Sequence, residues 1–184
     1  MTEHPETSSG LPRSLRNFII AGVAVILAIA LFIGLNTETG EANLEVQAEQ
    51  ATPLEVALDN SKPTFLEFYA NWCTSCQAMA QELQTLKNEY GESVNFVMLN
   101  VDNTKWLPEI LQYRVDGIPH FVYLDGDGKA IAQTIGEQPK SVLEADLQAL
   151  IAEKPLPYAN ATGQTSAFQA KVKPKNDDPR NHGG

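Results

Sequence analysis

The longest apolar run of the chain lies near its N-terminus, from Phe18 to Leu35, and contains no charged residue. As an α-helix it would be roughly 27 Å long, which is enough to cross a thin bilayer. A cleaved signal peptide is the alternative. Its apolar core usually has only about 7–15 residues, and the nearest small-x-small sequence, Val46-Gln47-Ala48, lies well beyond the run. We therefore predict an uncleaved transmembrane anchor over residues 17–35.

After residue 51 the apolar positions follow the two shorter periods of an α/β domain. Short apolar runs rich in aromatic and β-branched residues predict strands, and apolar residues at every third or fourth position predict helices. The order of these elements predicts an α/β fold with a central mixed sheet, in which strands joined by helices pair in parallel and a final hairpin is antiparallel. The predicted strands cover residues 64–70, 94–101, 120–124 and 130–135, and the predicted helices cover residues 53–59, 73–90, 105–113 and 139–153.

Three polar segments flank the anchor and the domain. Residues 1–16 contain two prolines and are expected to be disordered. Residues 36–51 are predicted to be an acidic spacer between the anchor and a folded domain at residues 52–153. Residues 154–184 are poor in apolar side chains and are expected to be extended or disordered.

The charge distribution predicts how the anchor is oriented. The net charge is −10 and the pI about 4.7, which excludes nucleic acid and an anionic membrane surface as expected partners. Arg13 and Arg16 precede the apolar run, whereas Glu38, Glu41 and Glu45 follow it. Because cationic flanks stay in the cytoplasm, the N-terminus should be cytoplasmic and the domain should lie across the membrane. That side is a periplasm or an equivalent lumen, where disulfides persist.

The only two cysteines, Cys73 and Cys76, stand within the sequence Trp-Cys-Thr-Ser-Cys. A disulfide between them closes a loop too short to restrain the unfolded chain much, so a scaffolding role explains them poorly. A zinc site needs four ligands, whereas His4, His120 and His182 are scattered, so we predict no metal. Thiol–disulfide chemistry remains, with the Cys73–Cys76 pair as the redox centre and no separate cofactor.

The predicted elements assign different roles to the two thiols. A strand leads into a helix that begins at Cys73, so this sulfur lies at a helix N-terminus, where unpaired N–H groups and the helix dipole favour an anion. We therefore expect a lowered pKa for the Cys73 thiol and nucleophilic attack by Cys73 on a partner disulfide. Cys76, one turn into the helix, should be the less exposed, resolving thiol that releases the reduced product.

The run FLEFYANWCTSC, the later Gly117-Ile118-Pro119 and the closing hairpin and helix together resemble the thioredoxin family over residues 52–153. This resemblance implies a thioredoxin fold and a cis Ile118–Pro119 bond packed against the cysteines, where a substrate peptide pairs as a strand. From the residues alone, a proline that opens a strand is more often trans, since cis accounts for about 5–6% of X–Pro bonds. Trp72, Ile118 and His120 are the candidate substrate-binding residues.

Glu67 stands six positions before Cys73, within an apolar strand. The resemblance implies a buried acid here that transfers a proton to and from the resolving cysteine. An exposed strand face is the alternative, because alternation places Glu67 opposite its apolar neighbours Leu66 and Phe68. We favour the catalytic role, since a central strand of a parallel sheet has both faces covered.

Three departures from the family pattern affect this reading. Thr74-Ser75 replaces the usual Gly-Pro inside the motif, so the reduction potential does not carry over. Met98 stands near the place of the lysine that usually accompanies the buried acid, so that pair is expected to be absent. His120 follows Pro119 where Thr is common. A protonated His120 near the thiolate would make the protein more oxidising, whereas a solvent-exposed histidine is the alternative.

More narrowly, VNFVMLNVDNTKW and GIPHFVYLD, together with the anchor, resemble the cyanobacterial and plastid membrane-anchored thioredoxin-like proteins of the TxlA type. This resemblance implies a thylakoid protein whose domain faces the lumen. It would receive electrons from a membrane thiol transporter of the CcdA type and reduce lumenal or periplasmic target disulfides, including those of apocytochromes.

Two other functions remain open from the sequence. A disulfide oxidase or isomerase on the same fold differs from a reductase only in its reduction potential. A copper-binding chaperone module would use Cys73, Cys76 and His120, because thiolates and an imidazole suit copper.

Overall fold

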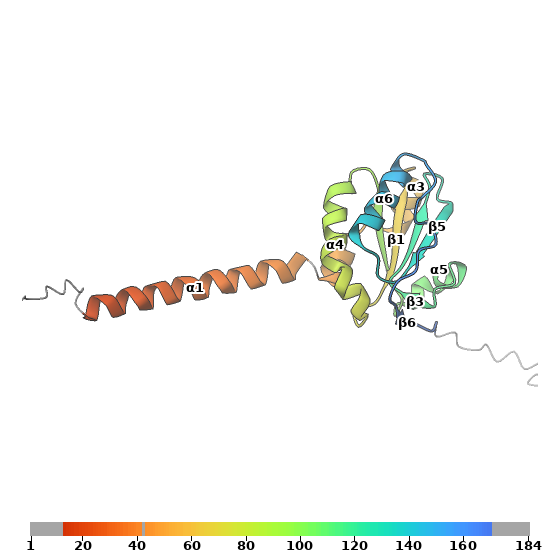
Figure 1. Cartoon of the computed structure of the whole chain (residues 1–184). Coiled ribbons are helices and arrows are strands. Elements are labelled where there is room, and N and C mark those ends of the chain that lie inside the picture. The colour runs from red at the N-terminus through yellow and green to blue at the C-terminus, as the bar shows by residue number, and fades with distance from the viewer. Residues whose placement is uncertain (1–12, 42, 171–184) are drawn as a thin grey trace, which may run out of the picture. The chain divides into compact units, whose positions relative to one another are not determined.

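The computed structural model describes residues 13–41 and 43–170, in two compact units that divide after Gly40 (Figure 1). The first unit is essentially helix α1, Arg13–Glu41. The segment Ser14–Leu31 is long and apolar enough to cross a membrane. The helix extends beyond the predicted anchor at both ends, so residues 13–16 are helical rather than disordered. Residues 1–12, also predicted to be disordered, lie outside the described part of the chain.

The second unit is built on a four-stranded mixed sheet with the order β2-β1-β4-β5. The central strand β1 pairs in parallel with β2 and antiparallel with β4, which continues into the β4–β5 hairpin. The prediction that helix-joined strands pair in parallel therefore holds only for β1 and β2. The bounds of the four strands are β1 Thr64–Tyr69, β2 Asn95–Asn100, β4 His120–Leu124 and β5 Ala130–Ile135.

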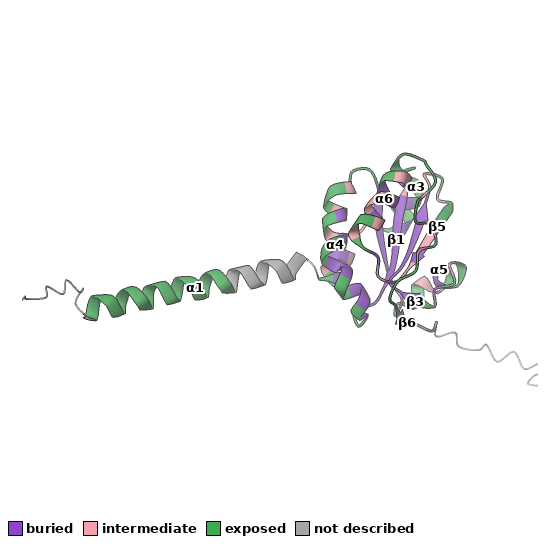
Figure 2. Cartoon of the chain, viewed as in Figure 1, coloured by how far each residue is buried: buried purple, intermediate pink, exposed green. Residues whose placement is uncertain are grey.

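Helices cover both faces of this sheet, and β1 is buried along its whole length (Figure 2). The longest, α4, Thr74–Tyr90, packs with α6, Lys140–Ile151, over a cluster of aromatic side chains that includes the stacked rings of Phe65 and Phe121. The opposite face is covered by α3, Leu54–Asp59, and α5, Leu107–Gln112, the latter preceded by a short 3₁₀ turn at Thr104–Trp106. This layered arrangement confirms the α/β thioredoxin fold predicted from the sequence.

The segment expected to be a spacer contributes to the domain. Helix α2, Leu44–Gln50, buries Leu44 and Gln47, and Gln47 donates a hydrogen bond to the carbonyl of Ala80 in α4 at 2.8 Å. The folded domain therefore begins before residue 52. The start of the domain predicted at residue 52 is therefore too late. Leu44 is the one apolar side chain that α2 buries, so its sequence carries no clear helical pattern.

The segment after α6 runs along the domain in an extended conformation. Its backbone bonds to the outer edge of β5, and Ser166–Ala167 forms strand β6 against β3, Gly117–Ile118. These two short strands lie side by side in Figure 1. The described part of the predicted tail is therefore extended and docked, and residues 171–184 lie outside the described residues.

Candidate active site

The two cysteines form a disulfide at the start of helix α4, with their Cα atoms 5.2 Å apart. Cys73 is the N-cap residue, and its Sγ accepts a hydrogen bond from the backbone N–H of Cys76 at 3.0 Å. The same N–H and the positive end of the helix dipole would stabilise a Cys73 thiolate after reduction. This geometry supports Cys73 as the nucleophile.

Burial does not distinguish the two sulfurs. Both Cys73 and Cys76 are fully buried, so the expectation that Cys73 is the more exposed is wrong for this state of the protein. The adjacent Trp72 is half-exposed, and its indole Nε1 donates to the carboxylate of Asp102 at 2.8 Å. Sequence reasoning did not single out Asp102, which fixes the orientation of this exposed indole beside the disulfide.

The Ile118–Pro119 peptide bond is cis, as the family resemblance implies. Pro119 joins β3 to β4, and its carbonyl accepts a hydrogen bond from the N–H of Gly136 at 2.7 Å. Ile118 is fully buried, and its backbone is opposite Ser166 of β6. Of the three candidate substrate-binding residues, only Trp72 is therefore open to solvent in this structure.

Glu67 is buried in the centre of the sheet, which excludes the exposed strand face as its position. It is paired with Met98 on one side and Phe121 on the other, on the face that α4 covers. Neither of its carboxyl oxygens has a hydrogen-bond partner among the residues that the structure describes. Burial disfavours the charged form and raises the pKa of Glu67 to about 7, against a smaller opposing effect of the Lys87 charge. A carboxyl with this pKa can both accept and release a proton at neutral pH.

Lys87 provides the charge that Met98 cannot. It projects from α4, and its ammonium group bonds to Met98 Sδ at 3.0 Å and to Gln47 Oε1 at 2.7 Å. Burial lowers the pKa of Lys87, and the charge of Glu67 raises it. The usual lysine is absent from the place of Met98, as expected, but the charge of Lys87 on helix α4 favours the carboxylate of Glu67 without a hydrogen bond to it.

Sequence reasoning missed Lys87 and Gln47, although one signal was present for Lys87. It follows Ala80 and Leu83 at the three- and four-residue spacings of one helix face, and that face is buried. A lysine on the same helix face as buried apolar residues is a candidate for a charged group that packs against the core. No comparable signal exists for Gln47, whose helix is short.

His120 lies on the opposite face of the sheet from Glu67. It pairs with Phe68, the next residue of β1 after Glu67, and successive residues of a strand point to opposite faces. The histidine is buried, not exposed, and its Nε2 bonds to Gln133 Oε1 at 2.7 Å. Burial lowers the pKa of His120, an effect that the Gln133 hydrogen bond and the charge of Asp116 only partly oppose. Burial therefore favours the neutral form of the imidazole.

Among the residues that the structure describes, no group of three or more His, Cys, Asp or Glu side chains is arranged to hold a metal ion. Cys73, Cys76 and His120 all belong to that described part. The three-ligand copper site considered from the sequence is therefore not formed.

A buried Cys-x-x-Cys disulfide at a helix N-terminus, in a domain that also holds a cis proline and a buried carboxyl, defines a thiol–disulfide oxidoreductase. The thioredoxin family profile matches residues 45–149. The chain belongs to the thioredoxin family.

The chain is also similar over nearly its whole length to named members of that family. It is 58% identical to the "Thiol:disulfide interchange protein TxlA homolog" of Synechocystis sp., over 94% of this chain and 96% of that protein. It is 50% identical to the "Thiol:disulfide interchange protein TxlA" of Synechococcus elongatus, over 96% of this chain and 94% of that protein. It is 41% identical to the "Thioredoxin-like protein HCF164, chloroplastic" of Arabidopsis thaliana, over 95% of this chain and 68% of that protein.

Proposed function

We propose that this protein is a membrane-anchored protein-disulfide reductase. Helix α1 is the anchor, with the N-terminus in the cytoplasm and the domain in a thylakoid lumen or periplasm. Electrons come from a CcdA-type membrane thiol transporter, and the targets are lumenal or periplasmic disulfides such as those of apocytochromes. The flanking charges of α1 and the similarity to the TxlA proteins support this assignment.

The reductive cycle begins with the reduced pair. The Cys73 thiolate, stabilised by the Cys76 N–H, attacks one sulfur of the target disulfide, forms a mixed disulfide and releases the other target sulfur as a thiolate, which takes up a proton. Trp72 and the backbone at Ile118 and Pro119 hold the target segment during this step.

Resolution of the mixed disulfide requires the second thiol to lose its proton. Glu67 accepts this proton, and the Cys76 thiolate then attacks Cys73, which re-forms the internal disulfide and releases the second target thiolate. The target gains two electrons and, with its second proton, becomes a dithiol. Lys87 stabilises the carboxylate that Glu67 becomes.

The single observation that favours reduction over oxidation is the neutral state of His120. Strongly oxidising members of this fold stabilise the reduced form, and a cationic histidine near the thiolate would do so here. Burial lowers the pKa of His120 and so disfavours such a cation at neutral pH.

The reduction potential of the Cys73–Cys76 pair tests the direction of electron flow. Equilibration of the full chain in detergent with thiol–disulfide buffers should give a value closer to about −270 mV, as for thioredoxin, than to about −120 mV, as for a strong oxidant. A potential at the oxidising end would assign the protein to the oxidases instead. Trapping of a covalent target by Cys76→Ser in cells would identify the substrates, and recovery of no target would contradict the assignment.

A further inference from the structure

The described tail occupies a strand edge immediately before Pro119. Gly117–Ile118 pairs antiparallel with Ser166–Ala167, with Ile118 opposite Ser166. The N–H of Phe168 bonds to the carbonyl of Asp116 at 3.1 Å, so residues 116 and 168 form a hydrogen-bonded pair. Because such pairs alternate along an antiparallel ladder, Ile118 and Ser166 are the next hydrogen-bonded pair, and the N–H of Ala167 points away from β3.

Three glycines allow the tail to approach this closely. A side chain at Gly136 or Gly163 would collide with backbone atoms of the other segment, because the tail backbone lies directly on the loop after β5. Gly136 also has a φ of +83°, a conformation that favours glycine. At Gly117 a Cβ would lie 3.2 Å from the side chain of Thr165. The tail and the loops on either side of Pro119 are therefore shaped to fit each other.

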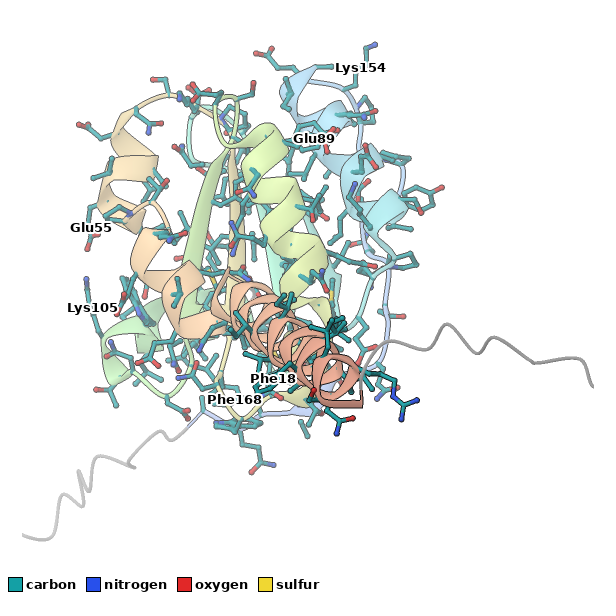
Figure 3. All side chains as sticks on the ribbon, turned by 90° about the vertical axis from the view of Figure 1, so that its left-hand side faces the viewer. Phe18, Glu55, Glu89, Lys105, Lys154 and Phe168 are labelled. Atoms are coloured by element: carbon teal, nitrogen blue, oxygen red, sulfur yellow. A yellow bond between two sulfur atoms is a disulfide. The ribbon has the colours of Figure 1, made fainter. Side chains whose placement is uncertain are left out.

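Side chains of the tail alternate as those of a docked strand do. Ser166, Phe168 and Ala170 are partly buried, whereas Ala167 and Gln169 are exposed. Phe168, labelled in Figure 3, packs with Ala170 against the core cluster and lines a pocket with Val101 and Asp102. Asp102 is the residue that holds the Trp72 indole. The tail thus reaches the rim of the active site.

We propose that residues 163–168 occupy the edge of β3, Gly117–Ile118, at which substrates dock. A target segment must therefore displace them before it pairs with Ile118. This inference rests on the proposed function, in which targets dock beside Pro119. With β6 removed, the backbone groups of Ile118 that face it would be unpaired, and such an edge is a template for an added strand. Targets bind only the molecules in which this edge is free. The apparent association constant for a target is therefore the intrinsic constant multiplied by the fraction of such molecules.

The side chains of the docked tail also indicate which target sequences fit the edge of β3. Opposite Ile118 it places a small side chain, Ser166, and two positions further on an aromatic side chain, Phe168, against the core. A competing target is therefore an extended segment with a small residue followed at the second position by a large apolar one.

The test uses the reduced full chain in detergent and two disulfide probes. Insulin presents a protein disulfide whose reduction requires docking of a segment, whereas 5,5′-dithiobis(2-nitrobenzoic acid) is too small to need the edge. Ser166→Pro removes the donor that pairs with Ile118, and Gly163→Ala clashes with the loop after β5. Ala167→Pro is the matched control, because its N–H faces away from β3. Hydrogen exchange at the Ile118 amide measures independently whether the tail is seated.

Loss of one backbone hydrogen bond changes an equilibrium by roughly fivefold. We expect kcat/KM for insulin to rise by about fivefold in both tail variants, with faster exchange at Ile118, and to stay within about twofold of wild type in the control. The rate with the small disulfide should be unchanged throughout.

A chain that ends at Gln164 lacks β6 entirely. It tests the inference even if the single substitutions do not release the tail from β3. Deletion of residues 171–184 alone is its control. Unchanged insulin reduction by the chain that ends at Gln164 would overturn the inference, and slower reduction would overturn it and assign the tail to the docking surface itself. Failure of every form, wild type included, to reduce either probe would instead overturn the proposed function, and the gating with it.

Discussion

Glu67 in β1 and His120 in β4 belong to neighbouring residue pairs of the same sheet, lie on its opposite faces, and are both buried titratable groups. Burial disfavours the charged form of each, but the consequences differ. The pKa of Glu67 rises to about 7, so the group exchanges a proton in the neutral range. The pKa of His120 falls, so the imidazole stays neutral there. The same desolvation therefore makes the acid a proton carrier and keeps the histidine out of proton transfer.

Their partners reinforce this difference. The charge of Lys87 favours the carboxylate form of Glu67. His120 instead has the amide of Gln133, which satisfies one ring nitrogen. The type of partner, together with burial, therefore decides which of the two groups can take part in the reaction.

Removal of the Glu67 carboxyl should have the largest effect. In Glu67→Gln the Cys76 thiol has no proton acceptor, so resolution of the mixed disulfide should slow on the order of 10²-fold at pH 7. Rapid mixing of the reduced protein with a disulfide peptide, followed by acid quenching, would show the mixed disulfide accumulating. Attack by Cys73 should keep its rate, and an undiminished resolution rate would assign proton transfer to another group.

Glu67 should also make the oxidised protein less stable at high pH. Its pKa is about 7 in the folded state against an ordinary value of 4.5, so the folded state binds more protons between these values and the free energy of unfolding falls as pH rises. Glu67→Leu should abolish this loss and increase stability at pH 8 by about 3 kcal/mol, with little change near pH 4.

Urea unfolding of the oxidised full chain at both pH values measures this effect. Asp146, whose pKa burial also raises, is present in wild type and variant and cancels in the difference. Parallel pH dependences in the two proteins would show that Glu67 is not the responsible group.

Replacement of Lys87 should have an intermediate effect. Without its charge the pKa of Glu67 should rise further, so the acid limb of the resolution rate should move to higher pH and the rate at pH 7 should fall several-fold. The comparison is between Lys87→Met and Lys105→Met. Lys105 pairs with Glu55 at 3.1 Å on the exposed surface, where both are labelled in Figure 3. Identical pH profiles for the two variants would remove Lys87 from the mechanism.

The smallest effect is expected at His120. His120→Gln keeps a donor that can bond to Gln133 but removes any titration. The reduction potential should shift by less than about 10 mV, which is within about twofold in the equilibrium constant. A shift of about 30 mV or more toward reducing values would mean that His120 carries a charge beside the thiolate. It would also remove the observation that favours a reductase.

The sequence was sufficient to predict those features that depend on residue type and local spacing. An isolated Cys-x-x-Cys pair at a strand-to-helix junction predicts a redox disulfide, and a glutamate within an apolar strand, together with the family resemblance, indicates a buried acid. Both predictions describe local chemistry, which depends on neighbours within one or two turns of the chain. The helix and strand positions followed for the same reason.

The sequence failed where the relevant neighbour is distant along the chain. Lys87 and Met98 are separated by the whole α4–β2 connection, and their contact depends on how helix and strand pack. The tail was expected to be extended or disordered, and its pairing with Gly117–Ile118 depends on glycines that make room only after folding. Helix α2 likewise depends on contacts with α4 rather than on its own pattern.

By itself, then, the sequence determined the redox pair, the apolar helix, the α/β order of elements and the acid beneath the cysteines, because each is written in local residue type and spacing. Tertiary structure alone decided that β4 lies antiparallel beside β1, that Lys87 serves Glu67, that His120 is neutral on the opposite face, and that the tail covers the edge before Pro119. The physical reason is that desolvation, charge pairing and strand addition all depend on which surfaces exclude water from one another, and only the packed chain establishes those surfaces.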